Sequence, residues 1–186
     1  PYQPVERDHG IMRDVLEVLS AFRHPVWITT RGTTIERDID LIAPMAAEGL
    51  AAVSVSVTTL DDDLARRMEP RAPAPKRRLL MIRRLAEAGI PVRIQVSPLI
   101  PALTDHELEA VMEAGRDAGA RFANSIPLRL PREVAELFRG WLEATVPDRA
   151  QRVMGRVREL HGGRDYDPEF GKRMTGQGLW ADLIRN

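Results

Sequence analysis

The chain has 186 residues, of which 44% are hydrophobic, so length and composition predict a globular domain with a sizeable core and exclude a disordered polymer. Its 27 lysines and arginines are balanced by 27 aspartates and glutamates, so the net charge does not indicate attraction to nucleic acid or to a membrane. The absence of cysteine excludes disulfides, and it excludes any thiolate-bound metal or cluster held by this chain alone.

Helix and strand patterns alternate along the chain with a period of roughly 30 residues, the size of one strand–helix unit. The clearest strand alternates Val53, Val55 and Val57 with serines, and Asp61 after it is a candidate helix N-cap. Gly49 and Gly89 are candidate helix ends. In chain order, the predicted elements are helix 10–22, strand 26–30, helix 34–49, strand 51–59, helix 77–89, strand 90–101, helix 106–119, strand 120–130, helix 133–146 and helix 149–163.

This alternation predicts an α/β fold of parallel strands with crossover helices, either an open sheet or part of a β/α barrel. No glycine-rich phosphate loop follows any predicted strand, which counts against a dinucleotide-binding sheet. Polar residues end four strands in step, which favours a barrel, where sites form at the carboxyl ends of strands. For any one residue, the simpler interpretation that a loop begins there stays open. These residues are Thr29, Thr30, Arg31, Ser56, Thr58, Thr59, Gln95, Ser97, Asn124 and Ser125.

The segment 66–78 places six cations and three prolines around one acid, Glu69. Because Glu69 precedes a proline, it is not expected in the middle of a helix, and an acid near a barrel mouth needs a cationic partner such as Arg71. We predict that both side chains face the strand ends and that the prolines hold the loop in one shape. Cations there could also bind nucleic acid phosphates. Four other arginines are interpreted as solvated helix faces, namely Arg66, Arg67, Arg77 and Arg78.

The four histidines lie far apart in the sequence and show no metal-ligand spacing, so we interpret them as caps or surface residues and predict no metal site in this chain. Residues 1–148 are assigned to the later strand–helix units of a partial barrel. Residues 149–186 are assigned to the same domain, as a helix and an irregular tail that docks through Tyr166, Phe170 and Trp180.

Several pieces of the sequence, in order, resemble one family. HPVWITTR, VSVTTLD, MEPRAPAPKRRL, LAEAGIPVRIQVSPLIPALTD and GGRDYDPEFGKRMTGQG are similar to radical S-adenosylmethionine (SAM) proteins of the spore photoproduct lyase type, also described as DNA-repair-photolyase-like. The resemblance covers nearly the whole chain. It implies a partial β/α barrel of the radical SAM type, SAM and a [4Fe–4S] cluster as cofactors, and cleavage of SAM to a 5′-deoxyadenosyl radical. The chain then corresponds to the later two-thirds of such an enzyme, with the N-terminal part missing.

The resemblance also implies a SAM site at the strand ends. Arg31 stands where the family usually has a lysine that contacts the SAM carboxylate, and arginine can bind a carboxylate but is bulkier. Ser56 matches a position implied to touch the ribose or amino-acid part of SAM. The strand ending in QVSPLIP is implied to lie under the adenine, although ordinary packing would also explain its apolar residues. The residues assigned to SAM are Arg31, Ser56, Gln95, Val96, Pro98 and Ile100, and those assigned to substrate are Glu69 and Arg71.

By this resemblance the full-length protein is expected to be a lyase-like enzyme with nucleic acid as a candidate substrate and an external electron donor as a partner. The chain alone is expected to be inactive, because the cluster ligands would lie upstream of Pro1. The alternative is a non-catalytic β/α binding module, or pseudoenzyme, without the cluster loop. No stretch is long enough to span a membrane and no signal peptide is visible, so a cytoplasmic protein is expected.

Overall fold

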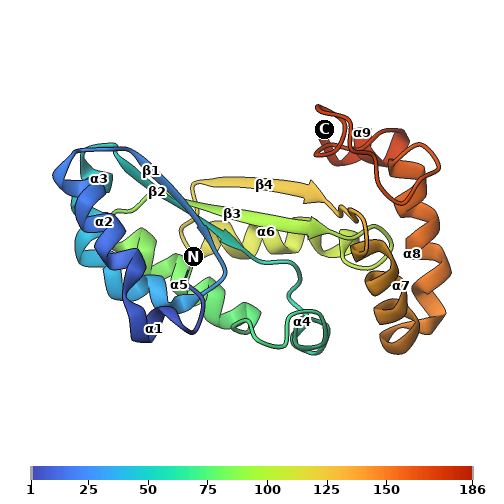
Figure 1. The fold of residues 1–186 in the computed structure, drawn as a ribbon, viewed down its shortest axis with the longest axis horizontal. Coiled ribbons are helices and arrows are strands. Elements are labelled where there is room, and N and C mark those ends of the chain that lie inside the picture. The colour runs from blue at the N-terminus through green and yellow to red at the C-terminus, as the bar shows by residue number, and fades with distance from the viewer. Residues whose placement is uncertain (1, 186) are drawn as a thin grey trace. The chain divides into compact units, whose positions relative to one another are not determined.

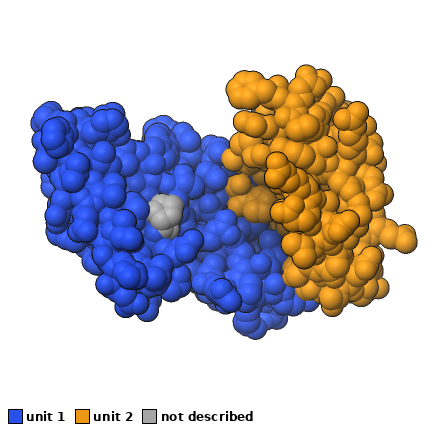
Figure 2. Space-filling view, in the orientation of Figure 1, with its two compact units in different colours: residues 1–96, 109–124 blue, residues 97–108, 125–186 orange. Residues whose placement is uncertain are grey.

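The structure, a computed structural model, describes residues 2–185. Its contacts divide the chain into two compact units, coloured separately in Figure 2. The first unit contains residues 1–96 and 109–124, and the second contains residues 97–108 and 125–186. The boundary that the sequence suggests near residue 148 stays a prediction.

The elements follow the predicted alternation of helices and strands (Figure 1). In chain order they are α1 (Glu6–His9), α2 (Ile11–Ala21), β1 (Val26–Thr30), the 3₁₀ helix η1 (Thr33–Asp38), α3 (Ile39–Ala47), β2 (Ala51–Ser56), α4 (Asp62–Met68), α5 (Pro75–Glu87), β3 (Val92–Leu99), the 3₁₀ helix η2 (Asp105–Glu107), α6 (Leu108–Asp117), β4 (Phe122–Pro127), α7 (Val134–Thr145), α8 (Pro147–Leu160) and α9 (Leu179–Arg185).

The strands form one sheet in the order β1-β2-β3-β4. β1 pairs with β2 and β2 pairs with β3, both in parallel, and β4 bonds to β3 through the Arg121 N–H and the Val92 carbonyl oxygen, 2.9 Å apart. The prediction of an α/β fold with parallel strands and crossover helices is therefore confirmed. None of the helices within residues 2–185 has both the length and the apolar character needed to cross a membrane.

One face of the sheet is apolar and buried by helices. The register places Ile28 beside Val53 and Val53 beside Val92, and none of the three is more than 2% exposed. Within the first unit, α3 and α5 contact β2, and α6 packs on β3. The last contact requires a glycine, because a Cβ on Gly115 would lie 2.5 Å from the Cδ1 atom of Ile94. Burial of each such aliphatic side chain contributes about 1.5–3 kcal/mol.

The opposite face of the sheet is polar. In the register, Thr29 pairs with Ser54 and Ser54 with Arg93, so the three form a row across β1, β2 and β3. Ser56 and Gln95 form the next row towards the strand ends. The two faces differ because side chains alternate along a strand, so the valines of β2 point one way and its serines the other.

The predicted helix ends are confirmed where a local signal specified them. The Asp61 carboxylate accepts hydrogen bonds from the N–H groups of Asp63 (2.8 Å) and Leu64 (3.0 Å) and so caps α4. Gly49 and Gly89 have φ of +75° and +80°, the left-handed region that favours glycine after a helix. α5 begins at Pro75, two residues before the predicted start, because proline is tolerated in the first turn.

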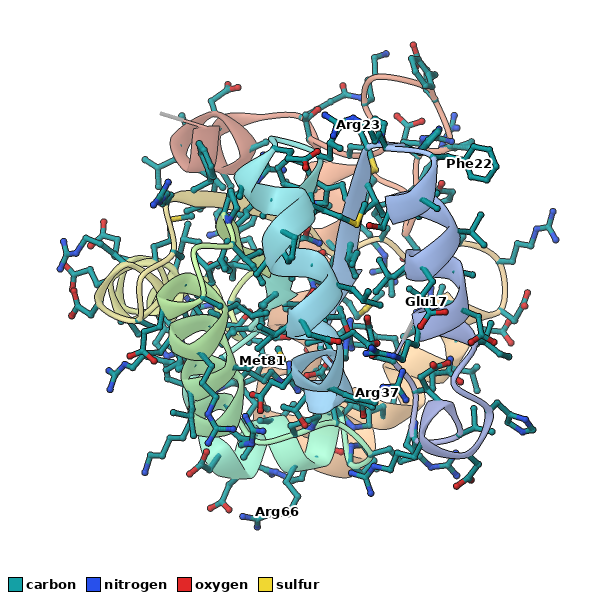
Figure 3. All side chains as sticks on the ribbon, turned by 90° about the vertical axis from the view of Figure 1, so that its left-hand side faces the viewer. Glu17, Phe22, Arg23, Arg37, Arg66 and Met81 are labelled. Carbon is teal, nitrogen blue, oxygen red and sulfur yellow. The ribbon has the colours of Figure 1, made fainter. Side chains whose placement is uncertain are left out.

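An ionic network attaches the N-terminal segment that precedes β1 to the 3₁₀ helix η1. The Asp38 carboxylate is fully buried and accepts hydrogen bonds from Tyr2, Arg13 and Arg37, which is labelled in Figure 3. Burial alone would raise the pKa of Asp38, but the hydrogen bonds from Arg37 and Tyr2 outweigh it and lower the pKa. Burial and the bond to Asp38 raise the pKa of the Tyr2 phenol. The carboxylate is therefore held ionised in the interior by its partners.

The second unit corrects two predictions about the end of the chain. The tail ends in the helix α9 instead of being irregular throughout, and Phe170 is 86% exposed, so it does not dock the tail. Tyr166 is half-buried against the ring of His161, and the Trp180 indole N–H donates to Asp105, so these two do make contacts. His161 itself is only 2% exposed and is the C-cap residue of α8, so of its two predicted roles, cap or surface residue, it has the first. Its Nε2 atom lies 3.2 Å from the Leu128 carbonyl oxygen, a partner distant in sequence.

Candidate active site

The carboxyl ends of β1 and β2 meet at one edge of the first unit because the two strands are parallel. Arg31 follows β1 directly, and Ser56 is the last residue of β2. Gln95 of β3 pairs with Ser56 in the register, so these two predicted residues are neighbours. Ser56 is buried and Gln95 is half-buried. The structure therefore gathers three of the predicted SAM-binding residues at the same end of the sheet.

Glu69 joins this edge through two arginines. Its Oε2 atom accepts a hydrogen bond from the Arg78 guanidinium at 2.5 Å, and its Oε1 atom accepts one from Arg31. The Glu69 side chain is only 10% exposed, while that of Arg31 is 46% exposed. The predicted need of Glu69 for an arginine partner is confirmed, although the partners are not the neighbouring Arg71. The role of Glu69 in binding a substrate stays a prediction.

Arg78 ties the loop after α4 to the end of β2. It is 2% exposed, and besides Glu69 it donates to the Ser56 carbonyl oxygen at 3.0 Å and to the Pro73 carbonyl oxygen at 2.7 Å. All three nitrogens of one guanidinium thus donate to acceptors on the loop after α4 and on β2, and the planar fork of arginine suits such an arrangement. The interpretation of Arg78 as a solvated helix-face residue is wrong.

The other cations of the segment 66–78 divide between surface and structure. Arg77 pairs with Glu36 through two hydrogen bonds of 2.6 and 2.8 Å, so it is half-buried rather than a free surface group. Arg66 is 72% exposed and projects away from the fold, as predicted (Figure 3). Arg71 is exposed and has no hydrogen bond or ion pair with any residue in the range 2–185. Its predicted orientation toward the strand ends has no contact to support it.

Thr58 offers an unused polar group close to this edge. Its side chain is 2% exposed, and its hydroxyl oxygen is buried with no hydrogen-bond partner in the described chain. An unsatisfied buried hydroxyl costs about 1–3 kcal/mol, so such a group is unusual unless a ligand or water meets it. Thr58 lies two residues after Ser56, the last residue of β2.

The polar face of the sheet adds an aromatic and a cation. The Trp27 indole N–H donates to the Ser54 hydroxyl at 2.8 Å, and the Arg93 guanidinium lies 4.3 Å from the centre of the Trp27 ring. The Nε atom of Arg93 is buried and has no partner within residues 2–185. The face is thus lined by groups that can bind a polar ligand, with Trp27 still 49% exposed.

The residues assigned to the adenine are placed differently from one another. Val96 is fully buried and alternates with Gln95, so it lies on the apolar face with Ile94 and not on the polar face. Pro98 and Ile100 belong to the second unit. There Ile100 is 1% exposed, and its N–H donates to the Thr104 hydroxyl at 3.0 Å. Their roles in binding adenine stay predictions.

Two features of this site escaped the sequence interpretation. Arg78 is spaced with the buried residues Met81, Ile82 and Leu85 at three, four and seven residues, so the helical period alone could have placed it on the buried face. The pairing of Trp27 with Arg93 had no such signal, because 65 intervening residues separate the two and only the strand register brings them together.

No metal site is assembled from the described side chains. Among residues 2–185, no group of three or more histidine, aspartate or glutamate side chains is arranged to hold a metal ion, and the sequence has no cysteine. The residues of this chain therefore do not fit the ligand set of an iron–sulfur cluster, which is held by thiolates. They do offer a guanidinium, hydroxyls and an amide suited to a carboxylate-bearing, hydroxyl-bearing small molecule.

Comparison with known proteins gives one family match and several uncharacterized relatives. A sequence model of the radical SAM superfamily matches residues 7–115, more than half of the chain. An uncharacterized protein of Mycobacterium tuberculosis (strain H37Rv) is 31% identical over 186 residues, 99% of this chain and 53% of the relative. An uncharacterized protein of Methanocaldococcus jannaschii is 26% identical over 147 residues, 79% of this chain and 53% of the relative. One of Acidianus two-tailed virus is 34% identical over 124 residues, 64% of this chain and 40% of the relative. The chain spans about half the length of the mycobacterial and methanococcal relatives.

Proposed function

This chain belongs to the radical SAM superfamily, and from that premise we propose that it is the SAM-binding part of a radical SAM enzyme of the spore photoproduct lyase type. The proposal for the fold is a partial β/α barrel. A sheet covered by helices on both faces is apolar on both, whereas this sheet has one apolar face and one polar face. A polar face turned toward a barrel interior, with the site at the strand ends, accounts for that difference.

The observation that supports the SAM site best is the connection of Arg31 to Ser56 through Glu69 and Arg78. Arg31 uses one nitrogen for Glu69 and keeps the rest of a half-exposed guanidinium for a carboxylate. Ser56, Thr58 and Gln95 would meet the hydroxyl and amine groups of SAM, and the unpartnered Thr58 hydroxyl fits such a contact. Arg78 and Glu69 would act indirectly, by holding Arg31 and the end of β2 in fixed positions.

A [4Fe–4S] cluster is held by thiolates, which the residues of this chain do not supply. When bound, SAM and a [4Fe–4S] cluster supply radical chemistry that abstracts hydrogen from a substrate. The residues of this chain would bind and orient SAM and shield it from water. We also propose nucleic acid repair or modification as the reaction and an external electron donor as a partner. Both rest on the resemblance of the sequence motifs alone. The alternative is a non-catalytic β/α binding module.

The test uses the protein expressed from the whole gene. Anaerobic reconstitution with iron and sulfide should give the absorbance of a [4Fe–4S] cluster. Reduction of the reconstituted protein should then cleave SAM, and chromatography measures the cleavage. Arg31→Gln should weaken SAM binding by roughly tenfold, the effect of one charge-assisted hydrogen bond, in isothermal titration calorimetry. The exposed Arg116→Gln is the matched control and should bind like the parent. A protein that stays colourless and leaves SAM intact would favour the binding module.

A further inference from the structure

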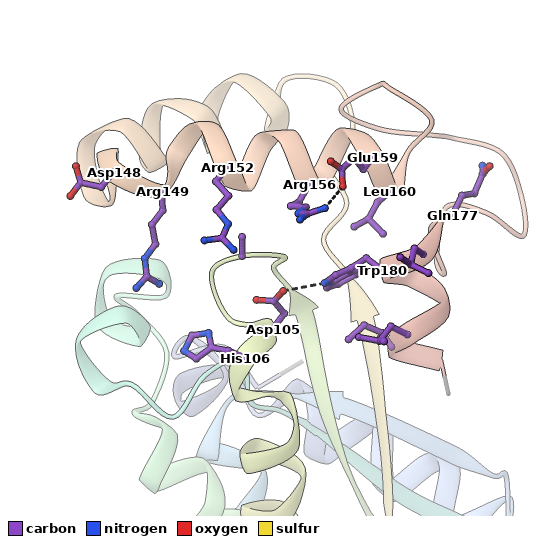
Figure 4. Close-up of a pocket in the computed structure, with 15 residues that line it drawn as sticks. Asp105, His106, Asp148, Arg149, Arg152, Arg156, Glu159, Leu160, Gln177 and Trp180 are labelled. Carbon is purple, nitrogen blue, oxygen red and sulfur yellow. Dashed lines mark hydrogen bonds and ion pairs between the residues drawn. The ribbon is translucent and has the colours of Figure 1, made fainter.

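The second unit contains a groove of about 780 Å³ that the proposed SAM site does not use (Figure 4). Three segments line it: the exposed face of α8, the loop that follows β3, and the last turn of the tail with α9. Its volume lies within the range of about 300–1,000 Å³ that is usual for small-molecule sites. We refer to it as the α8 groove.

A row of arginines forms one wall of the α8 groove. Arg149, Arg152 and Arg156 are separated by three and four residues and so share one face of α8. The adjoining face of the helix carries Val153 and Val157, both fully buried, so the helix is fixed and the arginine row is positioned by packing. In Figure 4, Arg149 and Arg152 point from α8 toward the loop that bears His106.

Two of these arginines have no counter-charge. Arg156 pairs with Glu159 at 2.6 Å, but the side chains of Arg149 and Arg152 make no hydrogen bond or ion pair with any residue in the range 2–185. Two further acids line the groove. Asp105 is engaged by the Trp180 N–H at 3.1 Å, and Asp148 is exposed in the first turn of α8, where the helix dipole favours an acid. The free cations therefore outnumber the one free acid, and the groove suits an anionic ligand.

Trp180 provides a flat apolar surface on the other wall. Its indole N–H is fixed by Asp105, and the Gln177 N–H donates to the Leu160 carbonyl oxygen at 2.9 Å, which attaches the preceding turn to the end of α8. Trp180 is half-buried, so part of the side chain is still accessible. A ring held in this way can stack on a planar ligand with little loss of side-chain entropy.

We propose that the α8 groove binds a nucleotide unit, with phosphate on Arg149 and Arg152 and the base on Trp180. Guanidinium groups match phosphate oxygens in geometry and charge, and bases stack on aromatic side chains with little dependence on sequence. An acidic peptide would also satisfy the arginines, but it would give the indole no planar partner. The unit can belong to a free nucleotide or to a nucleic acid strand. The inference names a site for the nucleic acid class in the proposed function, but binding here needs neither SAM nor a cluster.

The experiment measures binding to the full-length protein without SAM or cluster, so its failure leaves the radical SAM proposal intact. The probes are thymidine 5′-monophosphate and a short thymidylate oligonucleotide, with inorganic phosphate and a polyglutamate peptide for comparison. Arg149→Gln and Arg152→Gln should each raise the Kd roughly tenfold, and Trp180→Leu should raise it several-fold. Arg164→Gln, an exposed arginine of the same unit outside the groove, should leave it unchanged. Circular dichroism of each variant excludes loss of the fold.

The outcomes separate the possible ligands. Binding of the mononucleotide supports a free nucleotide as the source, and binding of the oligonucleotide alone supports a strand, and both uphold the proposal. Equal affinity of the parent and the two groove arginine variants would overturn it. Equal affinity for inorganic phosphate and for the nucleotide would also overturn the proposal, because the base would then contribute nothing to binding. Tighter binding of polyglutamate with the same dependence on Arg149 and Arg152 would assign the groove to an acidic protein instead.

Discussion

Replacing Arg78 with methionine would remove the guanidinium that joins α5, the loop after α4 and β2, while keeping an apolar side chain of similar length. The Ser56 and Pro73 carbonyl oxygens would each lose a donor, and Glu69 would lose its buried partner. Hydrogen bonds to charged groups are worth about 1.5–3 kcal/mol each, and removal of one partner from a buried ion pair costs about 3–5 kcal/mol. Because the loss of the hydrogen bonds and the loss of the ion pair overlap, the total loss of unfolding free energy is smaller than their sum.

The half-exposed Arg31 remains on Glu69 in this variant, so we expect the lower end of that range, about 3 kcal/mol of unfolding free energy. For a chain of this size that lowers Tm by on the order of 10 °C. The measurement is urea unfolding at neutral pH followed by circular dichroism and tryptophan fluorescence. Arg116→Met, at a guanidinium that is 70% exposed, is the control and should change stability by less than about 0.5 kcal/mol.

A double-mutant cycle sharpens the test. In the Arg78→Met background, Glu69 is a half-buried acid with only Arg31 as its partner, so Glu69→Met should cost less there than in the parent, and the two changes should not add. A loss below about 1 kcal/mol for Arg78→Met, or strict additivity with Glu69→Met, would show that the network does not hold the loop on β2.

Two further predictions concern stability. Gly115→Ala should destabilise the chain by about 1–3 kcal/mol, because the new Cβ meets Ile94, whereas Gly155→Ala, with nothing within 4 Å, should be neutral or stabilising by up to about 1 kcal/mol in thermal unfolding. Acid should also destabilise the fold, because burial raises the pKa of Glu36 and of Asp38 but arginine hydrogen bonds outweigh it and lower both. The stability that these two carboxylates contribute is complete above their unfolded pKa of about 4 and is lost as the pH falls through their lower pKa values in the folded state. Urea unfolding below about pH 4 should therefore show a smaller loss of stability with falling pH in Glu36→Gln than in the parent.

The candidate site could be predicted from the sequence only in part. Ser56 and Gln95 were found because polar residues at the ends of parallel strands must lie at one edge of the sheet, a consequence of strand direction alone. Glu69 was found because a residue before proline leaves the helix. Val96 was assigned to the adenine, and its alternation with Gln95 places it on the apolar face, as the strand period already implied; its role in binding stays a prediction.

The sequence by itself determined most elements of this protein, although not α9, and the direction of its strands, since hydrophobic period, caps and crossover length are local properties of the chain. Only the tertiary structure decided that Arg78 is buried against the end of β2, and that Trp27 lies under Arg93. It also decided that the side chains of Arg149 and Arg152 line one groove with Trp180 and have no ion-pair partner among residues 2–185. The physical reason is that a charged side chain takes its environment from whichever acceptors and rings the fold brings within a few ångströms. Spacing along the chain specifies which way an arginine points, and the packing of distant elements specifies what it meets there.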